Sequence, residues 1–168
     1  VWKLQVRDRR IARVVRACQD LPGQELFQYR DETGVIRDVT SSDVNDYLRE
    51  ISNEDVTAKD FRTWHGTVLA AMALQELQEF DGQAGAKRNM RQAIEQVAAR
   101  LGNTPTVCRK CYVHPEIFAV YAEGALQLQV KEQTGHESAP DLAGLSREEV
   151  AVLMLLRTRL GSTLADKL

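Results

Sequence analysis

The longest periodic segment of the chain covers residues 57–80 and reads TAKDFRTWHGTVLAAMALQELQEF. Its apolar side chains recur at the three- or four-residue spacing of one helical face. They are Phe61, Val68, Leu69, Met72, Ala73 and Leu77. We therefore expect a long helix from Thr57 to about Phe80, with Lys59 and Arg62 three residues apart on one face near its start.

Shorter helices are expected along the rest of the chain, from the same periodicity and from capping residues at their ends. They comprise residues 8–18 behind the N-cap Asp8, residues 43–51 behind Ser42 or Asp43, residues 90–101 before Gly102, a turn or helix over 103–112, residues 114–121, and residues 146–160 with a capping box between Ser146 and Glu149. We expect a short strand at Trp2–Val6, and either a small hairpin or a loop with extended arms at Leu26–Tyr29 and Val35–Val39. Polar, glycine-containing stretches predict a loop at Asp81–Gly85 and a linker at Lys131–Asp141. The expected fold is therefore mainly α, with a short β element near the N-terminus.

The composition is that of a globular domain with a sizeable core. The chain has 168 residues, of which 43% are hydrophobic and 27% are charged, and this length fits one domain. No apolar run approaches the roughly 20 residues that a membrane-spanning helix needs, and the basic start of the chain lacks the pattern of a signal peptide. Three cysteines are too few for a disulfide scaffold and favour a reducing compartment such as the cytoplasm. Membrane, collagen-like, disordered and disulfide-rich classes are excluded, and no membrane partner is expected.

Charge is distributed unevenly, although the net charge is only -2. Residues 1–16 and 87–112 each carry a net +5, whereas residues 17–86 carry -9 and residues 113–168 carry -3. Two basic segments in an acidic chain are typical of a protein that binds phosphate groups at particular places. The alternative is that these segments are solvated helix faces with opposite charges paired four residues apart.

Cys108 and Cys111 are separated by two residues, and His114 follows three residues later. A structural zinc site needs a second ligand pair, and the remaining cysteine and histidines stand singly in the sequence. The sequence also lacks a thioredoxin-like βαβ pattern, a glycine-rich phosphate loop and the common hydrolase motifs. We therefore expect incidental thiols, no metal site and no cofactor.

A phenol in this sequence is surrounded by groups that bind phosphate oxygens. Asn103 precedes Tyr112 by nine residues across a proline-containing turn, and Arg109 and Lys110 stand shortly before the tyrosine. A tyrosine is a weak nucleophile at its ordinary pKa near 10. Cations and amide donors around a phosphodiester stabilise the negative charge that builds on its oxygens as a phenol attacks phosphorus. The spacing is therefore compatible with phosphoryl transfer to a tyrosine.

Each of these residues also has a purely structural interpretation. Arg62 would form an ion pair with Asp60 or Glu76, Asn103 would cap a helix, and Tyr112 would be a half-buried aromatic side chain. Spacing by itself leaves both interpretations open.

Three blocks resemble the bacterial, poxvirus-like type IB DNA topoisomerases. They are CQDLPGQELFQY at residues 18–29, KDFRTW at residues 59–64, and GNTP at residues 102–105 followed by Tyr112. The blocks occur in the order and spacing of that family, from about Val6 to near Glu123 and more loosely to the end. The resemblance implies the helical catalytic domain of the type IB topoisomerase and tyrosine recombinase fold. It also implies an enzyme that nicks one strand of duplex DNA, holds a 3′-phosphotyrosyl link while the DNA rotates, and reseals it without ATP or metal.

The resemblance also implies a role for individual residues. Tyr112 matches the nucleophile, Arg62 matches an arginine that donates to the non-bridging oxygens of the scissile phosphate, and Asn103 matches a second donor to those oxygens. Lys59 matches a lysine near the active site that contacts DNA or supports Arg62. Contacts to the DNA backbone are expected from Arg109, Lys110, Lys87, Arg88 and Arg91.

The family also uses an arginine and a general-acid lysine on a hairpin before the first block, and Lys3 lies past the expected position of that lysine. The chain is therefore expected to be the C-terminal part of the catalytic domain, with the hairpin and the N-terminal DNA-clamping domain absent. Its helical part would cover residues 1–130, and residues 131–168 would form a linker and a C-terminal helix packed on it. By itself it would cleave DNA about 10²–10⁴-fold more slowly, the usual effect of losing general acid catalysis. With its clamping domain it would act as a monomer on duplex DNA in the cytoplasm, associated with the nucleoid.

Two other functions remain open. Tyrosine recombinases share the catalytic architecture, but Lys59 and Asn103 stand where those enzymes have histidines, and the Leu-Pro-Gly-Gln sequence at residues 21–24 favours a topoisomerase. A DNA-binding fragment without catalytic activity would use the basic segments alone.

Overall fold

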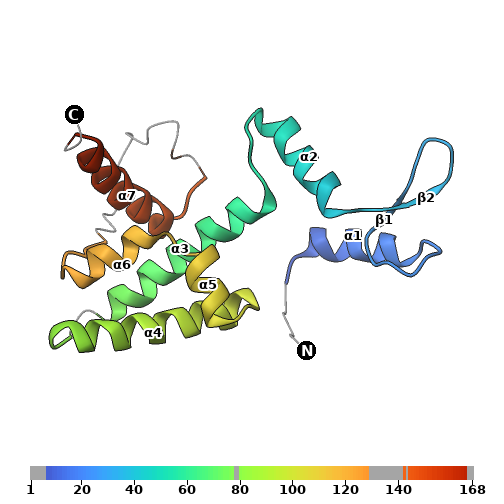
Figure 1. Ribbon diagram of the computed structural model, residues 1–168. Helices are drawn as coiled ribbons and strands as arrows, with labels where there is room; N and C mark the ends of the chain where they lie inside the picture. The colour runs from blue at the N-terminus through green and yellow to red at the C-terminus, as the bar shows by residue number, and fades with distance from the viewer. Residues whose placement is uncertain (1–6, 78–79, 129–141, 143, 166–168) are drawn as a thin grey trace. The chain divides into compact units, whose positions relative to one another are not determined.

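The computed structural model describes residues 7–77, 80–128, 142 and 144–165. Within these ranges the chain forms seven α-helices and one two-stranded sheet (Figure 1). The chain divides into two compact units, residues 1–60 and residues 61–168. The expected strand at Trp2–Val6 and the expected linker at Lys131–Asp141 lie outside the described residues. The mainly helical fold with a short β element near the N-terminus is confirmed.

The first unit contains α1 (Arg9–Gln19), β1 (Gln28–Arg30), β2 (Ile36–Asp38) and α2 (Ser41–Ser52). Asp8 caps α1 as predicted, because its carboxylate accepts the backbone N–H groups of Arg10 and Ile11 at 2.7 and 3.1 Å. β1 and β2 pair antiparallel with Tyr29 opposite Arg37, which confirms the hairpin, although its strands are shorter than expected.

Thr40 is the N-cap of α2, so the prediction of Ser42 or Asp43 was wrong. The Thr40 hydroxyl accepts the backbone N–H of Asp43, and the Asp43 carboxylate accepts the backbone N–H of Thr40 at 2.7 Å. This reciprocal capping box satisfies both backbone donors. Two hydrogen bonds from Thr40 also lower the pKa of the Asp43 carboxyl below its ordinary value.

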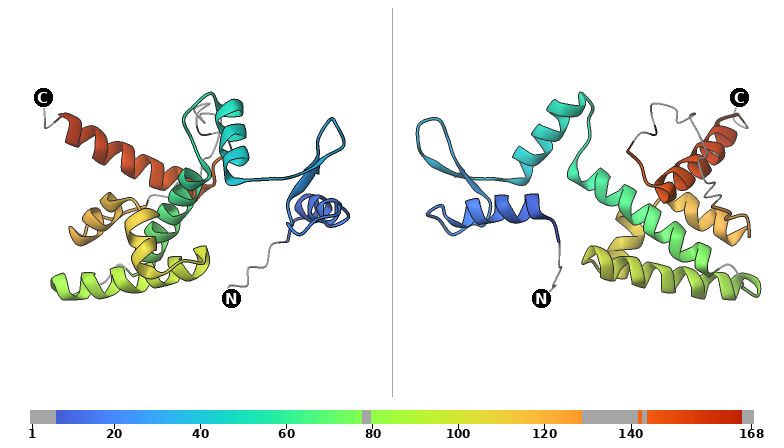
Figure 2. Two further views of the ribbon diagram at one scale, coloured as in Figure 1. Left: turned by 45° about the vertical axis from the view of Figure 1, so that its right-hand side comes forward. Right: turned by 180° about the vertical axis from the view of Figure 1, so that it is seen from behind.

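The second unit contains most of α3 (Ala58–Glu76), with α4 (Gly82–Leu101), α5 (Pro105–Cys111), α6 (Pro115–Ala122) and α7 (Arg147–Ala165). α5 and α6 lie against α4, and α7 lies against α6 (Figures 1 and 2). The buried face of α3 and α4 is rich in alanine, which lets neighbouring helices approach closely. Its alanines are Ala70, Ala71, Ala86, Ala93 and Ala98. Among the described helices, none is both long enough and apolar enough to cross a lipid bilayer.

The segment Asp81–Gly85 is not a loop, because α4 begins at Gly82 with Asp81 as its N-cap residue. Gly85 and Ala86 are both buried in the first turns of this helix. Packing of these small residues outweighs the low helix propensity of glycine, which is about 1 kcal/mol per residue less favourable than alanine. At the other end, Gly102 ends α4 in a left-handed conformation with φ 68°, as predicted.

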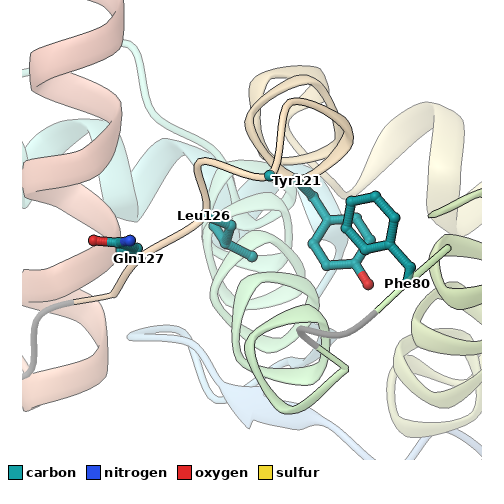
Figure 3. A pocket seen from close by; sticks show the side chains of 5 residues that line it. Phe80, Tyr121, Leu126 and Gln127 are labelled. Carbon is teal, nitrogen blue, oxygen red and sulfur yellow. The ribbon is translucent and has the colours of Figure 1, made fainter. Parts of the chain in front are cut away.

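A buried polar cluster joins Asn89 of α4 to the C-terminal ends of α3 and α6. The amide of Asn89 donates to the Tyr121 hydroxyl at 2.8 Å and to the Leu77 carbonyl at 3.1 Å, and the Tyr121 hydroxyl donates to the same carbonyl. The Tyr121 ring packs against Phe80 with centroids 5.0 Å apart and also lines a small pocket with Leu126 (Figure 3). The cluster supplies two donors to the carbonyl of Leu77, which is partly buried just beyond the end of α3.

Glu149 connects the N-terminus of α7 to α3. One of its oxygens accepts the backbone N–H of Ser146 at 2.8 Å, which confirms the capping box, and the other accepts the indole Nε1–H of Trp64 at 3.0 Å. These hydrogen bonds, led by the one from the Ser146 backbone, lower the pKa of the Glu149 carboxyl. α7 is thus attached to the helix that carries Arg62, two residues away from that arginine.

Replacing Glu149 with alanine should lower the free energy of unfolding by about 1–2 kcal/mol at neutral pH, since a helix cap and a charge-assisted hydrogen bond are lost. Because the folded protein holds this carboxyl at a lowered pKa, its stabilising contribution is complete above the ordinary pKa. It disappears as the pH falls through the lowered value. Urea unfolding followed by circular dichroism should therefore show wild type and Glu149→Ala converging at acid pH.

The control for this measurement is Glu148→Ala, which removes a neighbouring carboxyl from the same turn of α7. A loss in Glu148→Ala equal to that in Glu149→Ala would contradict the assigned role of Glu149.

Candidate active site

Three residues of α3 hold the backbone around Tyr112. The hydroxyl of Thr63 donates to the Cys111 carbonyl at 3.2 Å, and the hydroxyl of Thr67 accepts the backbone N–H of His114 at 3.0 Å. Gly66 lies between the two threonines on the same helical face, because residues three and four apart on a helix are neighbours. The chain is thus fixed on both sides of the tyrosine.

Gly66 permits the close approach of α3 to Tyr112. A Cβ atom built at Gly66 would overlap the carbonyl oxygen of Tyr112 and would also press on the side chain of Leu101. The backbone of α3 therefore contacts the Tyr112 carbonyl directly, and a residue with a side chain does not fit there.

The turn between α4 and α5 leaves the carbonyl of Leu101 available to side chains. In a continuing helix this carbonyl would accept the N–H of Pro105, but proline has no N–H. Thr104 caps α5 instead, its hydroxyl accepting the N–H of Val107 at 3.3 Å. The sequence from Leu101 to Pro105 thus ends one helix, starts the next and exposes an acceptor between them.

Arg62, Asn103 and Tyr112 converge at this turn. Nη2 of Arg62 donates to the Leu101 carbonyl at 2.8 Å, and Nδ2 of Asn103 donates to the same oxygen at 3.2 Å. Cζ of Arg62 lies 5.1 Å from the centre of the Tyr112 ring, in cation–π contact. The structure therefore brings together the guanidinium, the amide and the phenol that the sequence analysis grouped.

The purely structural interpretations of Arg62, Asn103 and Tyr112 are confirmed only in part. Asp60 does not pair with Arg62, because its carboxylate accepts the hydroxyl and backbone N–H of Thr57 at 2.7 and 2.9 Å. Within the described residues, Arg62 forms no ion pair. Asn103 does serve the end of α4, both through its amide and through its backbone N–H to Ala98. Tyr112 is partly buried at the end of α5.

This arrangement is suited to binding one anionic group beside a phenol. Each guanidinium carries five N–H donors, and the bond to Leu101 uses one of those of Arg62. An anion placed at the Leu101 carbonyl would accept hydrogen bonds from Arg62 and Asn103 together. Arg62 is exposed and Asn103 half-buried, so a ligand reaches both from solvent.

The other predicted residues lie on exposed surfaces of the same helices. Lys59 is exposed in the first turn of α3, one turn before Arg62. The basic side chains of α4 and α5 are exposed as well, namely Lys87, Arg88, Arg91, Arg109 and Lys110. The guanidinium of Arg109 is held 5.1 Å over the ring of Phe118. The roles of these residues stay predictions.

The two cysteines of α5 differ in environment. Cys108 is buried, and burial raises the pKa of its thiol, whereas Cys111 is exposed directly before Tyr112. A raised pKa reduces the thiolate fraction and the reactivity of Cys108. Within the part of the chain that the structure describes, no three His, Cys, Asp or Glu side chains cluster as metal ligands would.

Sequence reasoning missed the residues that position Tyr112. Thr63, Gly66 and Thr67 contact the tyrosine segment across 46 to 48 residues of sequence. A partial signal existed, since small or hydroxyl-bearing residues recur at helical spacing directly after Arg62. Such a pattern marks a close helix contact without identifying its partner.

The variant Gly66→Ala should move the Tyr112 backbone and cost about 1–3 kcal/mol of stability, the usual effect of overpacking a helix contact. The measurement is urea unfolding, with NMR shifts of Tyr112 reporting the displacement. Gly161→Ala is the matched control, since Gly161 lies in α7 with nothing within 4 Å of the added Cβ. It should be neutral or stabilising by up to about 1 kcal/mol. Equal stability of the two variants would contradict the close contact.

Comparisons with known proteins identify the family of the chain. A family model described as eukaryotic DNA topoisomerase I, catalytic core, matches residues 2–138. A DNA topoisomerase 1B of Acanthamoeba polyphaga mimivirus is 31% identical over 106 residues, which cover 59% of this chain and 32% of that protein. The chain therefore spans about a third of the length of this curated relative.

The resemblance to type IB topoisomerases is thus confirmed, while the narrower bacterial, poxvirus-like grouping and the position within the catalytic domain stay predictions. The matched residues include Arg62, Asn103 and Tyr112. Because the family model covers well over half of the 168 residues, the chain belongs to the family of the eukaryotic DNA topoisomerase I catalytic core.

Proposed function

We propose that this chain is the C-terminal part of a type IB topoisomerase of the bacterial, poxvirus-like kind, which relaxes duplex DNA with Tyr112 as its nucleophile. The observation that carries the proposal is the convergence of Arg62 and Asn103 on one carbonyl, with the Arg62 guanidinium against the Tyr112 ring. In a complex, the scissile phosphate would take the place of that carbonyl as the acceptor. Both donors would then face its non-bridging oxygens.

The reaction is a transesterification. The Tyr112 oxygen forms a bond to phosphorus, and the bond from phosphorus to the 5′-oxygen of the next nucleotide breaks. The phenol loses its proton and the departing 5′-oxygen gains one, so charge balances across the step. Arg62 and Asn103 stabilise the extra negative charge on the phosphoryl oxygens while five oxygens surround phosphorus.

Relaxation by this route needs neither ATP nor a metal ion. One phosphodiester is exchanged for another, so the free energy of the broken bond is kept in the 3′-phosphotyrosyl link. The DNA rotates while the link persists, and attack by the free 5′-hydroxyl restores the strand. A recombinase would instead pass the strand to a second, specific site, so relaxation of plasmid without strand exchange distinguishes the two functions.

The resemblance assigns the general-acid lysine and a further arginine to none of these 168 residues. We propose that another segment of the protein supplies both groups, together with a domain that clamps DNA, and that the protein acts as a monomer on cytoplasmic, nucleoid-associated DNA. The chain alone would bind DNA but expel an ordinary 5′-oxygen slowly. Lys59 would contact DNA near the site or support Arg62.

A substrate with sulfur in place of the bridging 5′-oxygen tests Tyr112 without the general acid. A thiol has a pKa near 8.5 and leaves as a thiolate without receiving a proton. The chain should therefore form a covalent adduct with this DNA that survives denaturant, and Tyr112→Phe should form none. Peptide mapping should locate the DNA on Tyr112. The control is Tyr47→Phe, which changes an exposed tyrosine of α2.

An adduct that persists in Tyr112→Phe would show that another residue attacks phosphorus. Binding of the DNA without any adduct would favour the DNA-binding fragment without catalytic activity.

The variant Arg62→Gln should form the adduct about 10²–10³-fold more slowly, as when one charge-stabilising donor is removed from an active site. Asn103→Ala should slow it by about tenfold, because a neutral hydrogen bond contributes less. Both rates come from quenched time courses on the sulfur-containing substrate. Arg157→Gln, which removes an exposed arginine from α7, is the control. An Arg62→Gln rate within twofold of wild type would refute the proposed role of Arg62.

A further inference from the structure

Two of the three cysteines of the chain stand in the last turn of α5, directly before Tyr112. Both are free thiols: Cys108 is fully buried, with 0% of its surface exposed, and Cys111 is exposed. Residues three positions apart on a helix are neighbours, with Cβ atoms about 5–6 Å apart. The sequence alone predicts incidental thiols, but the helix places the two as a pair at the end that leads into the tyrosine.

A disulfide between these two thiols requires a change in the backbone of α5. Its Cβ atoms must lie about 3.5–4.5 Å apart, which is about 1–2 Å closer than a regular helical turn holds them. Rotation of the side chains does not close this gap, because the backbone fixes the position of each Cβ atom. The last turn of α5, which is helical with both thiols free, must therefore distort when the disulfide forms.

The distortion reaches Tyr112 through two hydrogen bonds. The backbone N–H of Tyr112 donates to the Cys108 carbonyl at 2.9 Å, and the Thr63 hydroxyl donates to the Cys111 carbonyl at 3.2 Å. Both carbonyls belong to the turn that the disulfide distorts. The tyrosine has no room to move toward α3, since its own carbonyl already lies against the backbone at Gly66. Closure of the disulfide therefore displaces the tyrosine from its position in the reduced protein.

We propose that Cys108 and Cys111 form a reversible disulfide that displaces Tyr112 and thereby stops its reaction with DNA. The effect on the reaction rests on the proposed function, whereas the disulfide and the displacement do not. Tyr112 would lose its contact with Arg62, whose Cζ lies 5.1 Å from the ring centre in the reduced protein. Oxidation would thus disrupt the geometry on which the candidate site depends.

The oxidant is a low-molecular-weight disulfide, for which oxidised glutathione serves as the probe. The exposed Cys111 reacts first, because its thiolate attacks one sulfur of the oxidant, forms a mixed disulfide and releases one thiolate. The Cys108 thiolate then attacks the Cys111 sulfur, and a second thiolate leaves. The two cysteines have then lost two electrons and two protons, and the oxidant has become two thiols.

Burial of Cys108 makes the second exchange the slower step. It raises the pKa of the thiol, so a smaller fraction is present as thiolate. The rate of closure should therefore increase as the pH rises. Because closure strains the helical turn, the disulfide is readily reduced, as is typical of regulatory disulfides.

The test follows oxidation by mass spectrometry and by reaction with DNA. Cys18→Ser removes the remaining cysteine, so a disulfide within one chain of this variant joins Cys108 to Cys111. Oxidised glutathione should lower its mass by two hydrogens and shift the NMR signals of Tyr112. After removal of the oxidant, the adduct with the sulfur-containing DNA should form about 10²-fold more slowly, the effect of a misplacement of about 1 Å. Dithiothreitol should restore both the rate and the signals.

Two variants in the Cys18→Ser background serve as controls. Cys111→Ser replaces an exposed side chain and keeps the backbone carbonyl. It should fold, form the adduct at the rate of the reduced chain and show no response to the oxidant. Cys108→Ala should stop at the mixed disulfide and keep the Tyr112 signals of the reduced chain. Circular dichroism should confirm that both variants fold.

Oxidation that stops at the mixed disulfide with both cysteines present, or that joins two chains, would overturn the proposal. So would closure that leaves the Tyr112 signals unchanged, or equal slowing of the adduct in Cys108→Ala, which would show that the mixed disulfide blocks the site. A reduced chain that forms no adduct contradicts the proposed function alone, because the disulfide and the shifted signals are still measurable. Closure with an unchanged adduct rate contradicts only this inference.

Discussion

The site depends on the contact between the backbone of α3 and the carbonyl of Tyr112, which the absence of a side chain at Gly66 makes possible. One helix thereby carries Arg62 and also fixes the chain around the tyrosine, through Thr63 and Thr67. This shared helix therefore positions the Arg62 guanidinium against the Tyr112 ring. Side chains held by packed elements in this way lose little free energy to reorganisation when a ligand binds.

The ends of the helices were predictable where a local signal decides them. Asp8 and Ser146 cap their helices and Gly102 ends α4, as the sequence indicates. The start of α4 was not predictable from the local sequence. The glycines of Asp81–Gly85 favour a loop locally, whereas burial of Gly85 and Ala86 favours a helix. At α2, several capping residues stand close together, and the reciprocal bonds of Thr40 with Asp43 decide among them.

The candidate site was predictable only where resemblance to a family adds to the residues. Spacing alone left Arg62, Asn103 and Tyr112 with structural alternatives, and the blocks around them placed the three in one site. Contacts between distant segments leave no local pattern, so the bond from Trp64 to Glu149, 85 residues further on, was not predictable. The role of the Leu101 carbonyl as an acceptor for Arg62 was not predictable either, although Pro105 has no N–H to donate to that carbonyl.

That carbonyl has a consequence for ligand entry. Before any ligand arrives, Leu101 already fixes the rotamer of Arg62, a side chain whose freedom is worth about 1.5–2 kcal/mol. An incoming anion therefore exchanges one acceptor for a stronger one and does not have to immobilise a freely moving side chain. Because Pro105 cannot donate to the Leu101 carbonyl, that carbonyl is available to order the Arg62 side chain of α3. The entropic cost of ordering Arg62 therefore arises during folding and not when a ligand binds.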